Sequence, residues 1–319
     1  MTGGGVDGGV DAAVPGAGTP QAPPAGPAGT TDVFADTIAE LTWYEVERAA
    51  RDGAVLLWAF GVIEQHGPHL PAGTDVYLPG ARLREVRRLL AGRGIEALIV
   101  PPYYWGINVV SGSFPASYGI RPELMEQVMA DLLTGLAGDG FRHVFCFSGH
   151  GDALHNRTVH AGVRAGRERT GADISFVMEP ELAQRLGLDP DDPALTVHAS
   201  AASPGTPPGG RVAVSSPGSA AGGAGAGGID VHAGRWETSV MLHTHPGLVR
   251  DEVRATLPAT GHGLSELAVW RRGYDDARRV TPRGYFGDPA AAGADEGRQL
   301  HAAAAELAAD AIEERLGTG

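Results

Sequence analysis

The pattern of apolar and polar positions predicts buried strands separated by amphipathic helices. A strand covered on both faces is a continuous apolar run, and four stretches have this character. They are residues 54–63, 96–102, 143–148 and 173–178. Apolar positions at helical spacing predict four helices. These are residues 76–92, 121–140, 152–169 and 295–316.

Buried strands that alternate with amphipathic helices indicate an α/β fold, in which helices cover both faces of a mostly parallel sheet and form three α/β/α layers. Residues 237–245 are expected to form a helix or a strand close to the core. In such sheets ligands bind beyond the carboxyl ends of the strands. We therefore expect the loops that follow the strands to carry the functional groups.

Two segments rich in Gly, Pro and Ala interrupt this pattern, at residues 1–30 and 203–229. Such segments bury too little apolar surface to offset the entropy lost on ordering. We predict a disordered tail at 1–30 and a flexible insertion at about 203–229 within a single domain spanning 31–319. Deletion of either segment should leave the fold and the metal content intact.

The composition narrows the class of protein. Of the 319 residues 43% are apolar and 20% charged, as in ordinary globular proteins. The net charge of −13 argues against binding to nucleic acid or to an anionic membrane. No apolar run is long enough for a membrane span, and the first twenty residues lack a signal peptide pattern. The single cysteine, Cys146, is predicted to be a buried hydrophobe. We expect a soluble cytoplasmic protein.

The first candidate site is the loop EQHGPHLPAGTD, which follows the first predicted strand directly. It offers four potential ligands, Glu64, His66, His69 and Asp75. Carboxylates combined with neutral imidazoles suit Zn²⁺, Mn²⁺ or Fe²⁺, and a carboxylate can bridge two ions. The alternative is a surface loop with incidental polar residues.

The second candidate site is SGHGD, directly after the third predicted strand. Gly149 and Gly151 permit a tight turn that lifts His150 off the end of the strand. Asp152 has two interpretations, because it is placed either to bind a metal ion or to cap the following helix.

The third candidate site is HAGRWETS, at residues 232–239. His232 has an ordinary pKa near neutrality and is suited to give a proton to a leaving group. Glu237 is suited to bind a metal ion or to hold an attacking water. The alternative is a helix start capped by Thr238 or Ser239.

Three loops, each with a histidine and a carboxylate, supply enough ligands for two metal ions. Two ions about 3.5–4 Å apart hold a hydroxide and polarise a carbonyl at neutral pH. The sequence therefore predicts a binuclear hydrolytic centre.

These segments resemble the creatininase family of metal-dependent amidohydrolases, and the resemblance spans roughly residues 36–317. It is carried by EQHGPHLPAGTD (64–75), SGHGD (148–152), HAGRWETS (232–239), FPASYGI (114–120) and FGDPAAAGADEG (286–297). The resemblance implies a single α/β/α domain, and it implies a homo-oligomer that is often a hexamer.

The resemblance also implies roles for the metal ligands. Glu64 and His66 become ligands of different ions, Asp75 bridges the two ions, and His150 binds one of them. Asp152 stands where creatininase itself has a ligating Glu, so a carboxylate there favours a second ion. Two divalent ions per chain are implied, Zn²⁺ with Mn²⁺ or Fe²⁺ as alternatives.

Two further residues take chemical roles by the same resemblance. His232 becomes the acid/base that serves the leaving nitrogen, and Glu237 contacts the attacking water or an ion. The sequence departs from the family pattern at two positions. Ser148 replaces an Asn, and Gly228 stands where creatininase has a substrate-covering Trp. A different pocket lid follows, which argues against creatinine as the substrate.

The leading hypothesis is hydrolysis of a C–N bond in a small cyclic or linear amide by a metal-bound hydroxide. One alternative is a peptidase of the mycofactocin precursor type, which HTHPGLVR after the third motif also resembles. A second is a noncatalytic family member that binds metal or ligand. A third, on the same metal site, is a hydrolase that cleaves a carbon–carbon or lactone bond of a sugar or cyclitol.

Overall fold

The computed structural model describes residues 32–198 and 228–317. The predicted tail at 1–30 and residues 203–227 of the predicted insertion lie outside the described residues, so both stay predictions.

Five parallel strands form one sheet in the order β2-β1-β3-β4-β5. The strands are β1 (Val55–Phe60), β2 (Ala97–Tyr103), β3 (His143–Ser148), β4 (Asp173–Met178) and β5 (Leu195–Val197). Leu57 of β1 pairs with Ile99 on one side and with Phe145 on the other. The four strands predicted from apolar runs are confirmed. The three-residue β5 is too short to give a periodic signal.

The helices follow the strands in the predicted alternation. They are α1 (Trp43–Arg51), α2 (Thr74–Gly92), α3 (Pro122–Gly138), α4 (Ala153–Thr170), α5 (Pro180–Leu186), α6 (Arg235–Thr244), α7 (Asp251–Arg254), α8 (Leu264–Trp270), α9 (Tyr274–Val280) and α10 (Ala294–Gly317), with 3₁₀ turns η1 (Ile38–Glu40), η2 (Pro246–Leu248) and η3 (Pro289–Ala291). The four predicted helices are confirmed, and most of the ambiguous segment 237–245 lies in α6, a helix.

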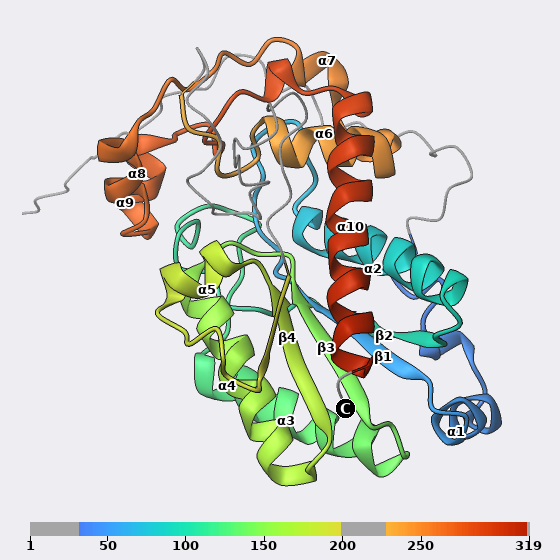
Figure 1. Cartoon of the computed structure of the whole chain (residues 1–319). Helices are drawn as coiled ribbons and strands as arrows, with labels where there is room; N and C mark the ends of the chain where they lie inside the picture. The colour runs from blue at the N-terminus through green and yellow to red at the C-terminus, as the bar shows by residue number, and fades with distance from the viewer. Residues whose placement is uncertain (1–31, 199–227, 318–319) are drawn as a thin grey trace, which may run out of the picture.

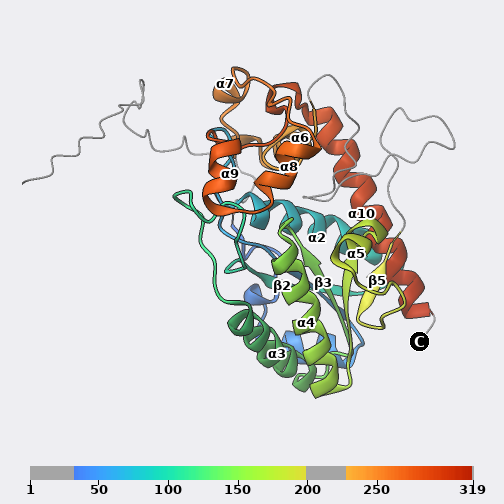
Figure 2. The ribbon, with the colours of Figure 1, turned by 90° about the vertical axis from the view of Figure 1, so that its left-hand side faces the viewer.

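Alternate residues of the strands face two separate apolar cores, because successive side chains of a strand point to opposite faces. Leu56 and Trp58 pack in the core that α3 and α4 cover, together with the buried Cys146. Leu57 and Ala59 pack in the core that α2 and α10 cover. Figures 1 and 2 show these helix pairs on opposite faces of the sheet. The predicted α/β/α layering is confirmed.

A third region, built from α6 to α9, lies beyond the carboxyl ends of the strands (Figure 1). It has two small apolar cores, one around Met241 and Leu257 and one around Trp270 and Phe286. This region closes over the end of the sheet at which ligands are expected. Among the described residues, no helix is long and apolar enough to cross a membrane.

Candidate metal centre

The ends of β1 and β3 hold the start of α2 close to the sheet, which fixes Asp75 in the first turn of that helix. The loop after β1 folds back because the Glu64 backbone N–H donates to the Ala72 carbonyl oxygen at 2.9 Å. Gly61 and Gly149 make the close approach possible. A methyl group on either glycine would overlap the Asp75 backbone carbonyl oxygen.

Asp75 lies between two histidines that approach its two carboxylate oxygens separately. His66 Nε2 lies 3.2 Å from Asp75 Oδ1, and His150 Nδ1 lies 2.9 Å from Asp75 Oδ2. Glu64 Oε2 is 3.0 Å from His150 Nδ1, and Glu237 Oε2 is 3.8 Å from His66 Nε2. The result is two ligand groups that share Asp75, one with Glu64 and His150 and one with His66 and Glu237.

Several polar atoms of this cluster are buried and, despite these close contacts, make no hydrogen bond of acceptable geometry. These atoms are Glu64 Oε2, His66 Nε2, Asp75 Oδ2 and His150 Nε2. A buried polar group without a partner costs free energy, and in each group the potential ligand atoms lie within 4.8 Å of one another. Two divalent cations would offset this cost, so the donor set fits a binuclear centre.

The protonation of the cluster also depends on the close contacts between its members. Burial opposes charge on His66, but the neighbouring Asp75 outweighs it and raises the pKa of His66 to about 10. Burial likewise opposes charge on His150, yet Glu64 and Asp75 hold its pKa well above the usual range. Burial raises the pKa of Glu237 to about 8. Without metal ions, the two histidines therefore hold protons that bound ions would displace.

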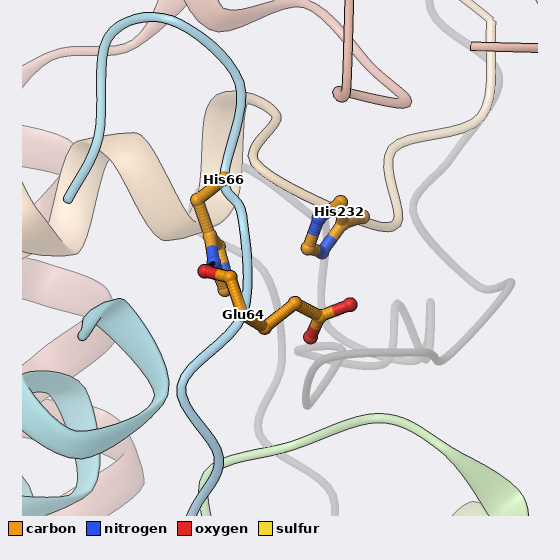
Figure 3. Close-up of side chains that lie close together, drawn as sticks. All are labelled: Glu64, His66 and His232. Atoms are coloured by element: carbon orange, nitrogen blue, oxygen red, sulfur yellow. Dashed lines mark hydrogen bonds between the residues drawn. The ribbon is translucent and has the colours of Figure 1, made fainter. Parts of the chain in front are cut away.

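His232 stands beside the ligands and is neutral at physiological pH. Figure 3 shows Glu64, His66 and His232 close together, and these three form a further group of potential ligands. Burial lowers the pKa of His232 to about 4. Its Nε2 lies 2.9 Å from the backbone carbonyl oxygen of Gln65. The side-chain Nε2 of Gln65 also lies 3.2 Å from this ring nitrogen, so both the backbone and the side chain of Gln65 hold the imidazole in place.

Glu237 and His232 are positioned by a loop that the C-terminal segment supports. Ala233 has φ of +47°, and its N–H donates to Glu237 Oε2 at 2.5 Å. Asp230 accepts from the N–H of Arg235 at 2.5 Å, at the start of α6. His232 forms an isolated bridge with Phe286. The segment FGDP at 286–289 therefore supports the third motif. The sequence analysis did not identify the contribution of Asp230.

Asp152 lies in the same cavity but outside the ligand groups. Its Oδ1 accepts from the N–H groups of Leu154 at 2.7 Å and His155 at 3.3 Å, and its Oδ2 accepts from the Val109 N–H at 3.0 Å. The side chain caps α4. The prediction that Asp152 binds metal stays a prediction, and the geometry favours the capping interpretation.

Two other buried histidines near the centre make structural contacts. His69, a candidate ligand by sequence, has its Nε2 2.9 Å from the hydroxyl of Thr238 and belongs to none of the ligand groups of the described residues. His155 Nδ1 accepts the backbone N–H of Ile107 at 3.2 Å. Both therefore hold loops together around the centre.

The centre opens into a cavity of about 360 Å³. Its walls combine apolar side chains with arginines that sequence reasoning missed. The apolar side chains are those of Val109, Val110, Leu154, Val231 and Trp270, and the arginines are Arg157, Arg185 and Arg271. The arginines come from three elements far apart in sequence, so no local motif could have revealed them.

The sequence matches known families over most of its length. A family model described as "Creatininase: Creatinine amidohydrolase" matches residues 39–312. The mycofactocin precursor peptide peptidase of Mycobacterium ulcerans (strain Agy99) is 30% identical over 253 residues, covering 77% of this chain and 80% of that protein. The creatinine amidohydrolase of Pseudomonas putida is 28% identical over 165 residues, covering 47% of this chain and 62% of that protein.

Solved structures share the fold. One described as "Creatininase Mn" aligns with a TM-score of 0.61 at 22% identity, covering 88% of this chain and 98% of that one. Another, a mutant creatininase described as "Zn-Zn type", aligns with a TM-score of 0.60 at 22% identity, covering 90% of this chain and 99% of that one.

Proposed function

The chain belongs to the creatininase family, and from this premise we propose that it is a hydrolase that uses two divalent metal ions to cleave the C–N bond of a small amide. The observation that carries the proposal is the pair of buried ligand groups that share Asp75. Similarity to both a peptidase and a creatinine amidohydrolase supports C–N cleavage as the common reaction.

In this proposal Glu64, Asp75 and His150 hold one ion, and His66, Asp75 and Glu237 hold the other. Bound ions lower the pKa of water and polarise a carbonyl group. The donor set of carboxylates and imidazoles suits Zn²⁺, Mn²⁺ or Fe²⁺. The similar structures described with Mn and with Zn-Zn support the first two. The homo-oligomer implied by the family stays a prediction.

His232 is proposed to move the proton of the reaction. Gln65 holds one side of the ring, and the neutral imidazole accepts a proton from the attacking water and returns it to the departing nitrogen. The ring packs against Trp270, with centroids 5.8 Å apart, and this contact limits the access of bulk water to His232.

A mycofactocin-type peptidase is the second candidate function. The similarity to the mycofactocin precursor peptide peptidase extends over 77% of this chain, whereas the similarity to the P. putida creatinine amidohydrolase extends over 47%. This difference favours a linear peptide over a cyclic amide as the substrate.

The test combines metal analysis with turnover. Protein loaded with Zn²⁺ or Mn²⁺ is expected to bind about two ions per chain and to hydrolyse at least one class among cyclic amides, formamides and short peptides. Asp75→Asn should lose ions from both groups and reduce turnover by at least about 100-fold. Asp131→Asn, on an exposed part of α3, is the matched control and should change neither.

The outcome that contradicts the proposal is two bound ions with no turnover across the panel. That result would favour a noncatalytic binding protein. His232→Ala separates the roles within the centre, because it should retain both ions and lose turnover.

A further inference from the structure

Three arginines face the cavity from three separate elements. Arg157 lies in α4, Arg185 in the last turn of α5, and Arg271 directly after α8. The chain has only 25 basic residues against 38 acidic ones. Three guanidinium groups around one cavity are therefore a local concentration of positive charge in an acidic protein.

Among the described residues, no ion pair joins Arg157 or Arg185 to a carboxylate. The side chain of Arg157 is held instead by the backbone of Leu186. The Nε of Arg157 donates to the Leu186 carbonyl oxygen at 3.3 Å. Burial lowers the pKa of Arg185 to about 10. The positive charge of Arg271 lowers this pKa further, and the negative charge of Glu179 raises it. A partly buried cation beside a like charge favours binding of an anion.

The carboxylates of the metal centre do not account for these arginines. Among the described residues, the close ionic contacts of Glu64, Asp75 and Glu237 are with His66 and His150. The arginines therefore form a second polar region of the cavity. Apolar wall residues, including Leu154 and Trp270, complete the cavity together with these two regions.

We propose that Arg157, Arg185 and Arg271 bind a carboxylate of the substrate, so that the protein acts on linear amides with a free carboxylate, such as short peptides or N-acyl amino acids. This inference rests on the proposed function, because the scissile carbonyl then lies at the metal centre. Guanidinium groups match carboxylates with paired, charge-assisted hydrogen bonds. Apolar side chains of the same cavity offer a surface for the apolar part of the substrate, and the cavity volume is that of a small-ligand site.

The experiment compares two probes of nearly the same shape, N-acetyl-leucine and N-acetyl-leucinamide, in which an uncharged carboxamide replaces the carboxylate. Binding to Mn²⁺-loaded protein is measured by calorimetry. The free acid is expected to bind at least about tenfold more tightly. Arg185→Gln and Arg271→Gln should each remove most of this preference with metal content unchanged, whereas Arg185→Lys should retain part of it.

Arg164→Gln, on an exposed part of α4, is the matched control and should leave the preference intact. Equal binding of the two probes by wild type, or binding of neither, would overturn the carboxylate site. So would a preference that persists in both arginine variants, because the metal ions would then bind the carboxylate. Turnover is a separate readout. An arginine-dependent preference without hydrolysis contradicts the proposed function, and hydrolysis without a preference contradicts only the carboxylate site.

Discussion

His150 and Asp152 stand two residues apart in one loop and yet face different surroundings. His150 points toward Glu64 and Asp75, whereas Asp152 turns back to accept backbone N–H groups at the start of α4. The sequence alone left both roles open for Asp152, because a carboxylate before a helix serves either as a ligand or as a cap.

The two roles of Asp152 make different predictions for Asp152→Ala. If the side chain caps α4, the variant loses about 1–2 kcal/mol of stability and keeps both metal ions. Thermal unfolding and elemental analysis of the variant beside wild type provide the measurement. Loss of one ion would instead establish Asp152 as a ligand.

Metal binding is expected to release protons. In the metal-free protein, His66 has a pKa of about 10 and the pKa of His150 is also raised, so both imidazoles are protonated at pH 7. A histidine ligand must be neutral and a carboxylate ligand ionised, and Glu237, with its pKa of about 8, is also largely protonated at pH 7. Binding of two ions should therefore release roughly three protons per chain, and metal affinity should rise with pH. Calorimetry at pH 7 in buffers of different ionisation enthalpy measures the release. A heat independent of the buffer would contradict the prediction.

At this scale the sequence predicted the proposed ligands that lie in short motifs after strands. Glu64, His66 and Asp75 fall within twelve residues, so their clustering follows from one loop. The contribution of Asp230 depends on a contact with Arg235 and on the distant Asp288. Contacts of that kind have no signature in local sequence.

At the scale of elements, the glycines at the ends of β1 and β3 govern where α2 begins. An alanine at position 149 would overlap both the Asp75 carbonyl oxygen and the ring of Pro79. The first turn of α2, and Asp75 with it, would have to move away from the sheet.

Gly149→Ala is therefore expected to destabilise the protein by on the order of 2 kcal/mol and to weaken metal binding. Gly135→Ala in α3 is the control, because nothing lies within 4 Å of its added methyl. That control should be neutral or stabilising by about 0.5–1 kcal/mol. Unfolding curves and metal titration of both variants test the idea, which fails if Gly149→Ala binds metal as wild type does.

Periodicity predicted the long helices and the buried strands because each extends over enough residues to show its period. The short helices α5 and α8, with seven residues each, were not predicted. Two of the three cavity arginines belong to α5 or to the residue after α8. The residues of the candidate metal centre were therefore visible in the sequence, while the arginines of the cavity were not.

At the scale of the whole molecule, the end of α10 is joined to the sheet by ion pairs. Arg315 contacts both carboxylate oxygens of Asp173, at 2.6 and 2.9 Å, and Arg167 contacts the same carboxylate at 2.6 Å. Burial opposes the charge on Asp173, but these two arginines hold its pKa well below the ordinary 3.8.

The sign of the pH dependence follows from this lowered pKa. The stability contributed by Asp173 is fully present above its unfolded pKa of 3.8 and is lost as the pH falls toward the folded pKa. Asp173→Asn should therefore be less stable than wild type by about 1–2 kcal/mol from pH 7 to about 5, and the gap should narrow below about pH 4. Urea unfolding of both proteins across this range is the measurement, and a gap that widens in acid would contradict the assignment.

The position of α10 in the chain has a consequence for how the protein is made. The ribosome releases all five strands, and every proposed ligand, before α10. Until α10 emerges, the face of the sheet formed by Leu57 and Ala59 is covered only by α2. In the same period α6, which carries Glu237, lacks the helix on which it packs. A nascent chain therefore exposes apolar surface of the kind that recruits chaperones. We therefore expect the proposed ligand group of His66, Asp75 and Glu237 to be completed only after α10 has emerged.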